Sequence, residues 1–187
     1  MTRDPISWTE TRQRLRADRQ RLRELLIAGG LPSQGLFFHP SYVCVLLHRI
    51  SHYWFRSGHR YLARFFWHLN TIVTGADISE PCDLGPGLLI VSPTGVAIMA
   101  SAGRNLTIFP LAGIGGEIGR REDVGAGPGL PMLGDDVVME PHSGILGPVR
   151  IGSRARLRAG SVVVGDVPED AVVELPRARV LHPGREA

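Results

Sequence analysis

Apolar residues recur at every sixth position in the second half of the chain. Each aliphatic residue is followed four places later by a small or branched one: Leu133, Met139, Ile145, Ile151, Leu157 and Val163, with Val137, Ser143, Val149, Ala155, Ser161 and Val167. Neither an α-helix nor a pleated strand has a period of six. Such a short repeat predicts a solenoid, whose units bury their apolar faces only by stacking on their neighbours. We therefore expect a triangular β-helix in which both residues of each pair, one aliphatic and one small, point inward and the corners carry compact residues.

The same period is present earlier in the chain. The aliphatic positions are Ile78, Leu84, Ile90, Val96, Ala102, Ile108 and Ile114, followed by Cys82, Leu88, Thr94, Ala100, Leu106 and Ala112. Register is lost only between Ile114 and Leu133, where glycine and proline are frequent, so the pattern predicts one solenoid with a single excursion loop over residues 117–131. Because a loop of this length in a compact domain is usually functional or disordered, it is the first place to look for a site.

The first apolar pattern in the chain predicts a helix from Trp8 to Ala28, which Thr9 or Ser7 can cap. Its leucines lie on one side, and its remaining surface is strongly basic: Leu15, Leu22, Leu25 and Leu26, with Arg12, Arg14, Arg16, Arg19, Arg21 and Arg23. A nucleic-acid or membrane surface is one interpretation of such a helix. The pattern favours a solvated face, because acidic residues are interspersed among the arginines.

Helical periodicity continues from Ser41 to about Val73 and predicts one or two further helices, whose aromatic residues we expect to cover the open end of the solenoid. His48 and His52 are four residues apart, a spacing that can place two metal ligands on one helix face. No acidic third ligand follows at a useful distance. The pattern favours packed or surface histidines, and we predict no metal.

These patterns divide the chain into an α-helical region over residues 1–75, a solenoid over residues 76–168 and a tail over residues 169–187. The net charge of +3 is too small to indicate nucleic acid. The two cysteines, Cys44 and Cys82, form no metal or redox pattern. No secretory signal or membrane-spanning apolar run is visible. We expect a cytoplasmic protein that binds neither nucleic acid nor membrane.

Several motifs then carry a resemblance to a known family. In chain order they are His48-Arg49-Ile50-Ser51-His52, Gly58-His59-Arg60, Thr74-Gly75-Ala76-Asp77-Ile78, Gly85-Pro86-Gly87, Pro93-Thr94-Gly95-Val96, Gly115-Gly116, Ile145-Leu146-Gly147-Pro148-Val149 and Ala159-Gly160-Ser161-Val162. Over roughly residues 41–180 the chain resembles the serine O-acetyltransferases of the hexapeptide-repeat superfamily. The resemblance implies a mainly β fold, a left-handed parallel β-helix preceded by an α-helical region. It also implies a homotrimer with active sites between adjacent solenoids.

The chemistry implied by the resemblance is transfer of an acetyl group from acetyl-CoA to a hydroxyl, with a histidine as general base. The sequence departs from the family where this base is expected. Ser92 stands at the position of the catalytic histidine, and Val91 at that of an amine-binding aspartate. Leu130 stands at the position of a second histidine late in the excursion.

The candidate catalytic residues are Asp77, which survives from the family pattern, Ser92, and His142, the one histidine within the solenoid. The resemblance places the pantetheine arm of acetyl-CoA, or of another acyl-CoA, against small residues: Gly115, Gly116, Ala159 and Gly160. Two hypotheses stay open. One is an acyl-CoA-dependent O-acyltransferase with a divergent hydroxyl-bearing acceptor. The other is a catalytically inactive homologue that binds a ligand or a protein partner.

The resemblance leads us to expect that copies associate as a trimer. Four valines are assigned to the flat faces of the solenoid, where they leave apolar surface for a neighbour: Val137, Val138, Val162 and Val164. Closed cyclic association buries such surface.

Overall fold

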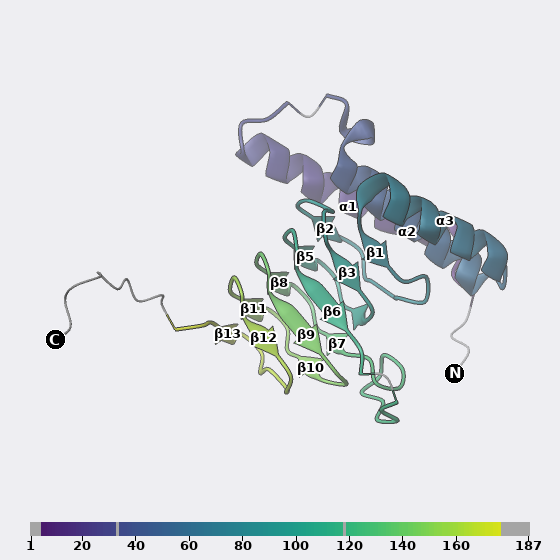
Figure 1. Ribbon diagram of the computed structural model, residues 1–187. Helices are drawn as coiled ribbons and strands as arrows, with labels where there is room; N and C mark the ends of the chain where they lie inside the picture. The colour runs from purple at the N-terminus through teal and green to yellow at the C-terminus, as the bar shows by residue number, and fades with distance from the viewer. Residues whose placement is uncertain (1–4, 33, 118, 177–187) are drawn as a thin grey trace.

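A computed structural model describes residues 5–32, 34–117 and 119–176 (Figure 1). The first part holds three α-helices and one short 3-10 helix: α1 (Trp8–Ala28), η1 (Leu36–Phe38), α2 (Pro40–Arg56) and α3 (Arg60–Thr74). The predicted first helix is confirmed, and Ser7 rather than Thr9 caps it, because the Ser7 hydroxyl accepts a hydrogen bond from the Glu10 amide at 3.0 Å. The predicted second helical stretch is two helices, separated at Gly58.

The rest of the described chain winds through three parallel sheets. Sheet 1 contains β1 (Asp77–Ile78), β3 (Ala97–Ile98), β6 (Gly113–Gly115), β9 (Gly144–Leu146) and β12 (Val162–Val163). Sheet 2 contains β4 (Ser101–Ala102), β7 (Met132–Leu133) and β10 (Arg150–Ile151). Sheet 3 contains β2 (Leu89–Ile90), β5 (Thr107–Ile108), β8 (Val138–Met139), β11 (Arg156–Leu157) and β13 (Val172–Val173). Each turn of chain supplies strands to the sheets in this order, which gives the predicted left-handed β-helix.

The interior of the solenoid follows the predicted sixfold pattern in its second half. Leu133, Met139, Ile145, Ile151 and Leu157 are all at most 2% exposed, and one regular coil runs from Leu133 to its partner Ile151. Val137 is fully buried, which fits its place in the sixfold pattern and not the flat face. Val162 and Val164 are exposed as expected, and Val138 is half-buried.

The register of the first coils differs from the prediction. Ile78 pairs with Ile98 rather than Val96, and Ile98 pairs in turn with Ile114. The step from the inward Ile90 to the inward Ile98 is therefore two residues longer than the repeat of six. The step from Ile98 to Ala102 is two residues shorter, which restores the register. Thr94, a predicted inward position, is therefore exposed, and Pro93 is buried. The slip was invisible in the sequence because Val96 and Ile98 are both apolar and both 1% exposed.

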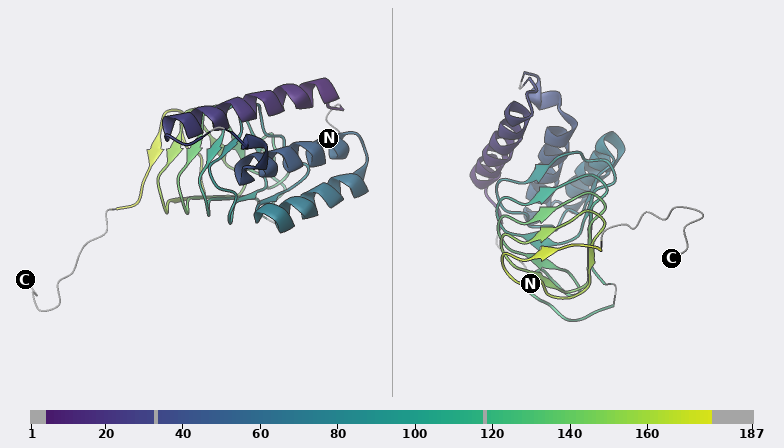
Figure 2. Two further views of the ribbon diagram at one scale, coloured as in Figure 1. Left: turned by 90° about the horizontal axis from the view of Figure 1, so that it is seen from above. Right: turned by 90° about the vertical axis from the view of Figure 1, so that its left-hand side faces the viewer.

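The helices cover the end of the solenoid that β1 begins (Figure 2). α2 lies between α1 and α3, and its Cys44 and Val45 join the solenoid core. The expectation that aromatic side chains cover this end is wrong for α3, where Tyr61 is 94% and Phe65 59% exposed. Polar residues of α2 occupy much of the junction instead. Arg49 and His52 form hydrogen bonds with backbone carbonyls of the first coil, those of Leu84, Gly85 and Glu80.

A buried ion pair joins the helices to the first coil. Arg49 of α2 donates to both carboxylate oxygens of Asp18 of α1, at 2.9 and 3.1 Å, and each residue is 2% exposed. Arg49 also donates to the carbonyls of Leu84 and Gly85, and Asp18 accepts from the Leu88 amide at 2.7 Å. The two charged side chains thus neutralise each other and also bind backbone carbonyl and amide groups in the turn between β1 and β2.

None of the helices in the described part of the chain is long and apolar enough to cross a membrane. The predicted tail is described only to residue 176, and its arginine-rich end lies outside the described residues.

Candidate active site

The three corners of the solenoid differ in what their residues do. We call the turn from sheet 1 to sheet 2 the loop corner, because it carries the excursion after Gly116. The turn from sheet 2 to sheet 3 is the glycine corner, built on Gly85, Gly103, Gly134 and Gly152. The turn from sheet 3 to sheet 1 is the histidine corner, in which Thr94, Leu111, His142 and Gly160 occupy successive coils. These coils are joined by hydrogen bonds such as the Leu111 amide to the Thr94 carbonyl at 3.1 Å.

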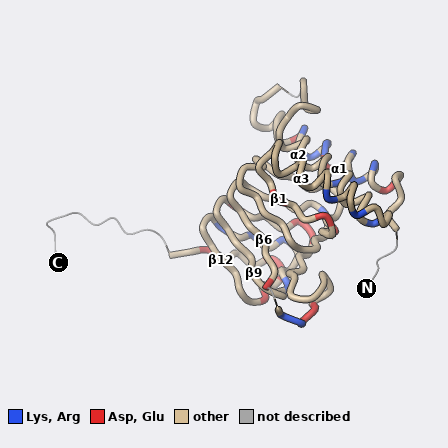
Figure 3. Tube along the Cα trace, turned by 45° about the vertical axis from the view of Figure 1, so that its right-hand side comes forward, with Lys and Arg blue, Asp and Glu red and all other residues tan. Residues whose placement is uncertain are grey.

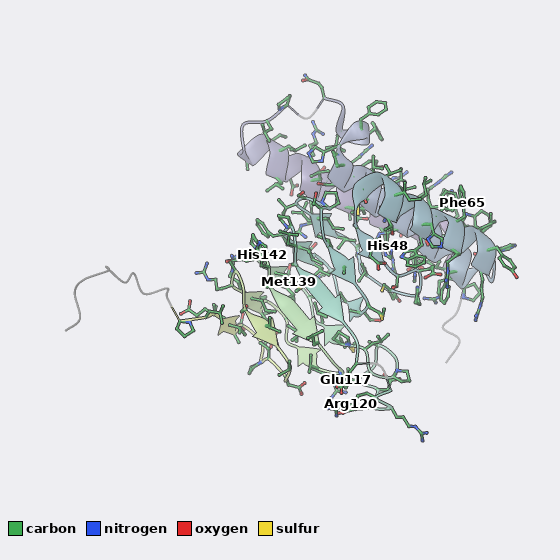
Figure 4. The ribbon with its side chains drawn as sticks, viewed as in Figure 1. His48, Phe65, Glu117, Arg120, Met139 and His142 are labelled. Atoms are coloured by element: carbon green, nitrogen blue, oxygen red, sulfur yellow. The ribbon has the colours of Figure 1, made fainter. Side chains whose placement is uncertain are left out.

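The predicted site residues lie on sheet 1 and its two edges. Ser92, His142, Ala159 and Gly160 belong to the histidine corner, and Gly115 and Gly116 belong to the loop corner. Asp77 lies on β1 of sheet 1 itself. Figure 4 shows His142 at one edge of the solenoid and the loop residues Glu117 and Arg120 at the opposite edge. One chain therefore does not bring the two groups of candidates together.

His142 is exposed and lies in the left-handed region with φ of 59°. This conformation does not by itself mark a functional residue, since Asn105, Asp136 and Arg154 adopt it at the glycine corner and Leu111 at the histidine corner. The tight corners of the coil require it. What distinguishes His142 is its side chain, an exposed imidazole beside sheet 1 on a rigid backbone.

Ser92 lies in the enlarged turn that accommodates the two extra residues, and it is half-buried. The neighbouring Val91 carbonyl accepts a hydrogen bond from Ser41 of α2 at 3.1 Å, and the Val91 side chain packs on an apolar cluster of the helices. The coil of Leu111 lies between those of Ser92 and His142. At about 4.8 Å per coil the two residues are about 10 Å apart along the axis. They cannot form a direct hydrogen-bonded pair.

Asp77 is exposed and already has a partner. Its Oδ1 accepts a hydrogen bond from the Trp67 indole Nε1 of α3 at 2.7 Å. The Arg64 guanidinium lies over the same indole ring, 5.1 Å from its centroid. The helix above therefore fixes the carboxylate at the first strand of sheet 1.

The small residues at the two edges have structural reasons to be small. A Cβ on Gly116 would lie 2.6 Å from Leu130 Cδ2 and 2.9 Å from the Gly129 carbonyl oxygen. Gly160 has φ of 77°, where glycine is favoured. Gly115 is half-buried beside Leu146, and Ala159 is exposed. Their size alone does not demonstrate a ligand groove.

The excursion loop is braced by its own hydrogen bonds. The Glu117 amide donates to Gly129 and the Gly129 amide to Glu122, at 3.0 and 2.7 Å. Arg120 pairs with Glu117 at 2.8 Å and Glu122 at 3.9 Å, all on the surface. Between this loop and β9 lies an open groove of about 530 Å³ lined by Gly116, Glu117, Arg120, Leu146 and Val164, among others.

Glu140 lies beside the candidate site although it is not among the predicted site residues. Its carboxylate accepts hydrogen bonds from Arg156 and Arg158 at 3.1 Å each and from the Ala159 amide at 3.3 Å. Desolvation acts to raise the pKa of Glu140, but these bonds outweigh it and hold the pKa below its ordinary value. The signal was the spacing, since Arg158 follows Glu140 by one coil. Glu140 is ionised at neutral pH. Its hydrogen bond with the Ala159 amide fixes the histidine-corner turn of the next coil, which stacks on the turn that contains His142.

The other reactive side chains are packed away from solvent. Burial raises the pKa of the Cys44 thiol to about 11 and that of Cys82 to about 12, so both are protonated at neutral pH. His48 and His52 lie on the buried side of α2, as the sequence pattern favoured. Within the described ranges, no group of three or more His, Cys, Asp or Glu side chains could hold a metal ion.

Comparison with known proteins connects this arrangement to one family. No family model matches the chain. The serine acetyltransferase of Mycobacterium tuberculosis is 33% identical over 161 residues, which are 85% of this chain and 68% of that protein. The serine acetyltransferase of Synechococcus elongatus is 31% identical over 152 residues, and the chain spans only 59% of its length.

Solved structures agree. Neisseria gonorrhoeae serine acetyltransferase in complex with serine superposes with a TM-score of 0.79 at 32% identity, over 94% of this chain and 71% of that one. Soybean serine acetyltransferase complexed with serine gives a TM-score of 0.78 at 29% identity, over 92% and 70%. The resemblance first found in the motifs is therefore confirmed, and the chain belongs to the serine acetyltransferase family.

Proposed function

We propose that this protein is an acyl-CoA-dependent O-acyltransferase whose acceptor is a hydroxyl compound other than serine. Its family membership supports the reaction class, since two of its structural neighbours were solved with serine, itself a hydroxyl compound. The observation that carries the proposal is the exposed His142 at the edge of sheet 1, on the same corner as Ser92. Histidine is the side chain most often used as general base.

In the proposed reaction, His142 accepts the proton of the acceptor hydroxyl as its oxygen attacks the thioester carbonyl of acetyl-CoA or another acyl-CoA. An ester C–O bond forms, the thioester C–S bond breaks, and the departing CoA thiolate takes up a proton. Ser92, about 10 Å away along the axis, orients a distant part of the acceptor or a water molecule, because a hydroxyl can donate and accept hydrogen bonds. Asp77, held by Trp67, provides a fixed carboxylate at the upper end of the same sheet.

The groove at the loop corner is the proposed place for the acyl-CoA, with the pantetheine arm passing Gly115 and Gly116 of one copy and Ala159 and Gly160 of its neighbour. Because the two edges of sheet 1 lie apart in one chain, the proposed site is composite and requires a homotrimer. Sheet 1 supports this assembly, since its outer face exposes apolar side chains: Met99 46%, Leu146 52%, Val162 58% and Val164 75%.

The alternative is a catalytically inactive homologue that serves as a ligand-binding or partner-binding subunit. Two substitutions favour it. Ser92 stands where the family resemblance places the catalytic histidine, and Leu130, at the position of the second, packs on the loop corner beside Gly116. Neither side chain can accept a proton from a hydroxyl near neutral pH.

Release of free CoA, followed with a thiol reagent, tests the proposal on the wild-type protein with acetyl-CoA and amino-acid, sugar and polyol acceptors. We expect thiol release with a non-amino-acid acceptor and very slow turnover of serine, because Val91 offers no charge to hold the serine ammonium group. Thermal stabilisation by acetyl-CoA without thiol release in any acceptor class would favour the inactive homologue. Rapid turnover of serine would contradict the proposed acceptor.

A further inference from the structure

The exposed arginines of α1 form a single stripe. Residues 8, 12, 16, 19, 23 and 27 fall within a sector of about 100° on a regular helix. They are Trp8, Arg12, Arg16, Arg19, Arg23 and Ile27, and every one is exposed. The exposed acidic residues of α1, Glu10 and Glu24, fall outside this sector. The result is a stripe of four positive charges with an apolar side chain at each end.

The structure separates these arginines from two others that have a structural role. Arg21 donates to the Gly87 carbonyl at 2.6 Å and to Thr107 at 3.0 Å, and Arg14 to Asp83 at 2.7 Å. Around the helix, the buried face of α1 separates these two arginines from the stripe. Within the described residues no hydrogen bond or ion pair of the four stripe arginines is found, although Arg12 lies over the Trp8 ring, 5.4 Å from its centroid. This distinction was not accessible from the sequence, which shows six similar residues.

The stripe leads into an apolar tip at the connection between α1 and α2. We define the tip as Ile27, Leu31, Phe37 and Phe38, which are 58%, 57%, 60% and 88% exposed. The Arg19 guanidinium lies over the Phe37 ring, 5.6 Å from its centroid, so the tip and the stripe share one surface. Figure 1 shows this connection projecting beyond the helices, on the side away from the solenoid.

Charge is distributed unevenly between the two parts of the molecule. Residues 5–75 contain ten arginines and three acidic residues, an excess of seven positive charges, although the whole chain carries only +3. Figure 3 shows basic residues concentrated along the helices. A second copy would bring like charges together if it docked on the stripe through the same surface. Charge complementarity therefore favours an anionic partner.

We infer that the α1 stripe and the tip bind the surface of an anionic lipid membrane, with Phe37 and Phe38 entering the headgroup region and the arginines pairing with lipid phosphates. Amphipathic helices with basic and apolar residues bind membranes in this way. A lipid surface accounts for both features, because it offers negative charge and an apolar phase. A nucleic acid would account for the arginines but offers no apolar phase for Ile27 and Leu31. This differs from the sequence expectation of no membrane partner, which treated the arginines as one solvated face, and it does not depend on the proposed function.

Co-sedimentation of the full chain with vesicles tests the inference. Vesicles of phosphatidylcholine with phosphatidylglycerol should bind the protein, vesicles of phosphatidylcholine alone should bind it weakly, and added salt should reduce binding. Each surface arginine contributes about a fivefold change in affinity. The Arg19→Gln, Arg23→Gln variant should therefore bind about 25-fold more weakly. The Arg104→Gln, Arg154→Gln variant removes the same charge from the exposed solenoid surface and should bind like wild type.

The tip is tested by a second pair of variants. Phe38→Ser should weaken binding to anionic vesicles even at low salt, whereas Tyr61→Ser, which removes a similarly exposed ring from α3, should not. Three results would overturn the inference: no sedimentation of wild type with anionic vesicles at low salt, equal losses in the two arginine variants, or stripe-dependent binding to duplex DNA in preference to vesicles.

Discussion

The glycine corner and the histidine corner of the same solenoid obey different constraints. At the glycine corner a Cβ on Gly85 would lie 2.4 Å from the Gly103 carbonyl oxygen, and one on Gly134 would lie 2.7 Å from the Ser153 amide nitrogen. At the histidine corner the corresponding turns carry side chains as different as those of Leu111 and His142. The glycine positions of the first corner leave no room for a side chain, although the left-handed positions beside them vary between Asn105, Asp136 and Arg154. At the second corner the turn positions carry different side chains, so its chemistry can change without disturbing the coil.

The helices reinforce this difference. Arg49, Asp18 and Arg21 all bind backbone groups of the first coil near the glycine corner, between Leu84 and Leu88. At the histidine corner the Ser41 hydroxyl of α2 donates to the Val91 carbonyl. The fold can therefore be held through one corner while the side chains at another corner change.

The largest expected effect on stability is at the junction. Asp18→Ala leaves Arg49 buried without its counter-charge, and breaking such a pair costs about 3–5 kcal/mol. The midpoint of urea unfolding should fall accordingly. Asp170→Ala removes a carboxylate from an exposed ion pair with Arg154 and is the matched control, expected to leave the midpoint unchanged. Equal behaviour of the two variants would mean that the junction does not hold the helices in place.

A second effect on folding stability is expected when the pH is lowered. Burial lowers the pKa of His52 to about 4, from an ordinary value of 6.5, although a hydrogen bond to the Glu80 carbonyl and the charge of Asp83 oppose the shift. Burial also lowers the pKa of His48, neither of whose ring nitrogens has a hydrogen-bond partner in the described part of the chain. Between pH 6.5 and about 4 the unfolded chain binds protons that the folded one does not.

Stability should therefore decrease as the pH falls through this window, by about 3 kcal/mol from His52 alone. Urea unfolding at a series of pH values measures the slope, and His52→Gln should reduce it. A slope that is the same in His52→Gln and wild type would show that His52 does not titrate as described.

The glycine corner gives a smaller effect. Gly134→Ala forces a Cβ against the backbone of the next coil and should destabilise the protein by about 1–3 kcal/mol. Gly165→Ala adds the same atom where nothing lies within 4 Å, and should be neutral. Thermal unfolding of the two variants compares them directly. Two neutral substitutions would contradict the close stacking at this corner.

Sequence reasoning found the solenoid because inward side chains such as Met139 and Leu157 recur at a fixed spacing that no other fold requires. It missed the shift of register at Ile98, since both the predicted inward position, Val96, and the observed one, Ile98, are apolar. It could not pair Asp18 with Arg49, because contacts between distant segments leave no periodic signal. The candidate site residues came largely from the family motifs. Only the structure showed that His142 and Gly116 lie at opposite edges of sheet 1.

The most direct test of the account is His142→Gln, measured both for thiol release from acetyl-CoA and for urea unfolding. A surface substitution away from packed groups changes stability by less than about 0.5 kcal/mol, so the unfolding midpoint should stay at the wild-type value. Loss of a general base should lower the rate by about 10²–10⁴-fold. A variant that keeps the wild-type rate, or that loses its activity only because it unfolds, would contradict the assignment of the chemistry to the histidine corner.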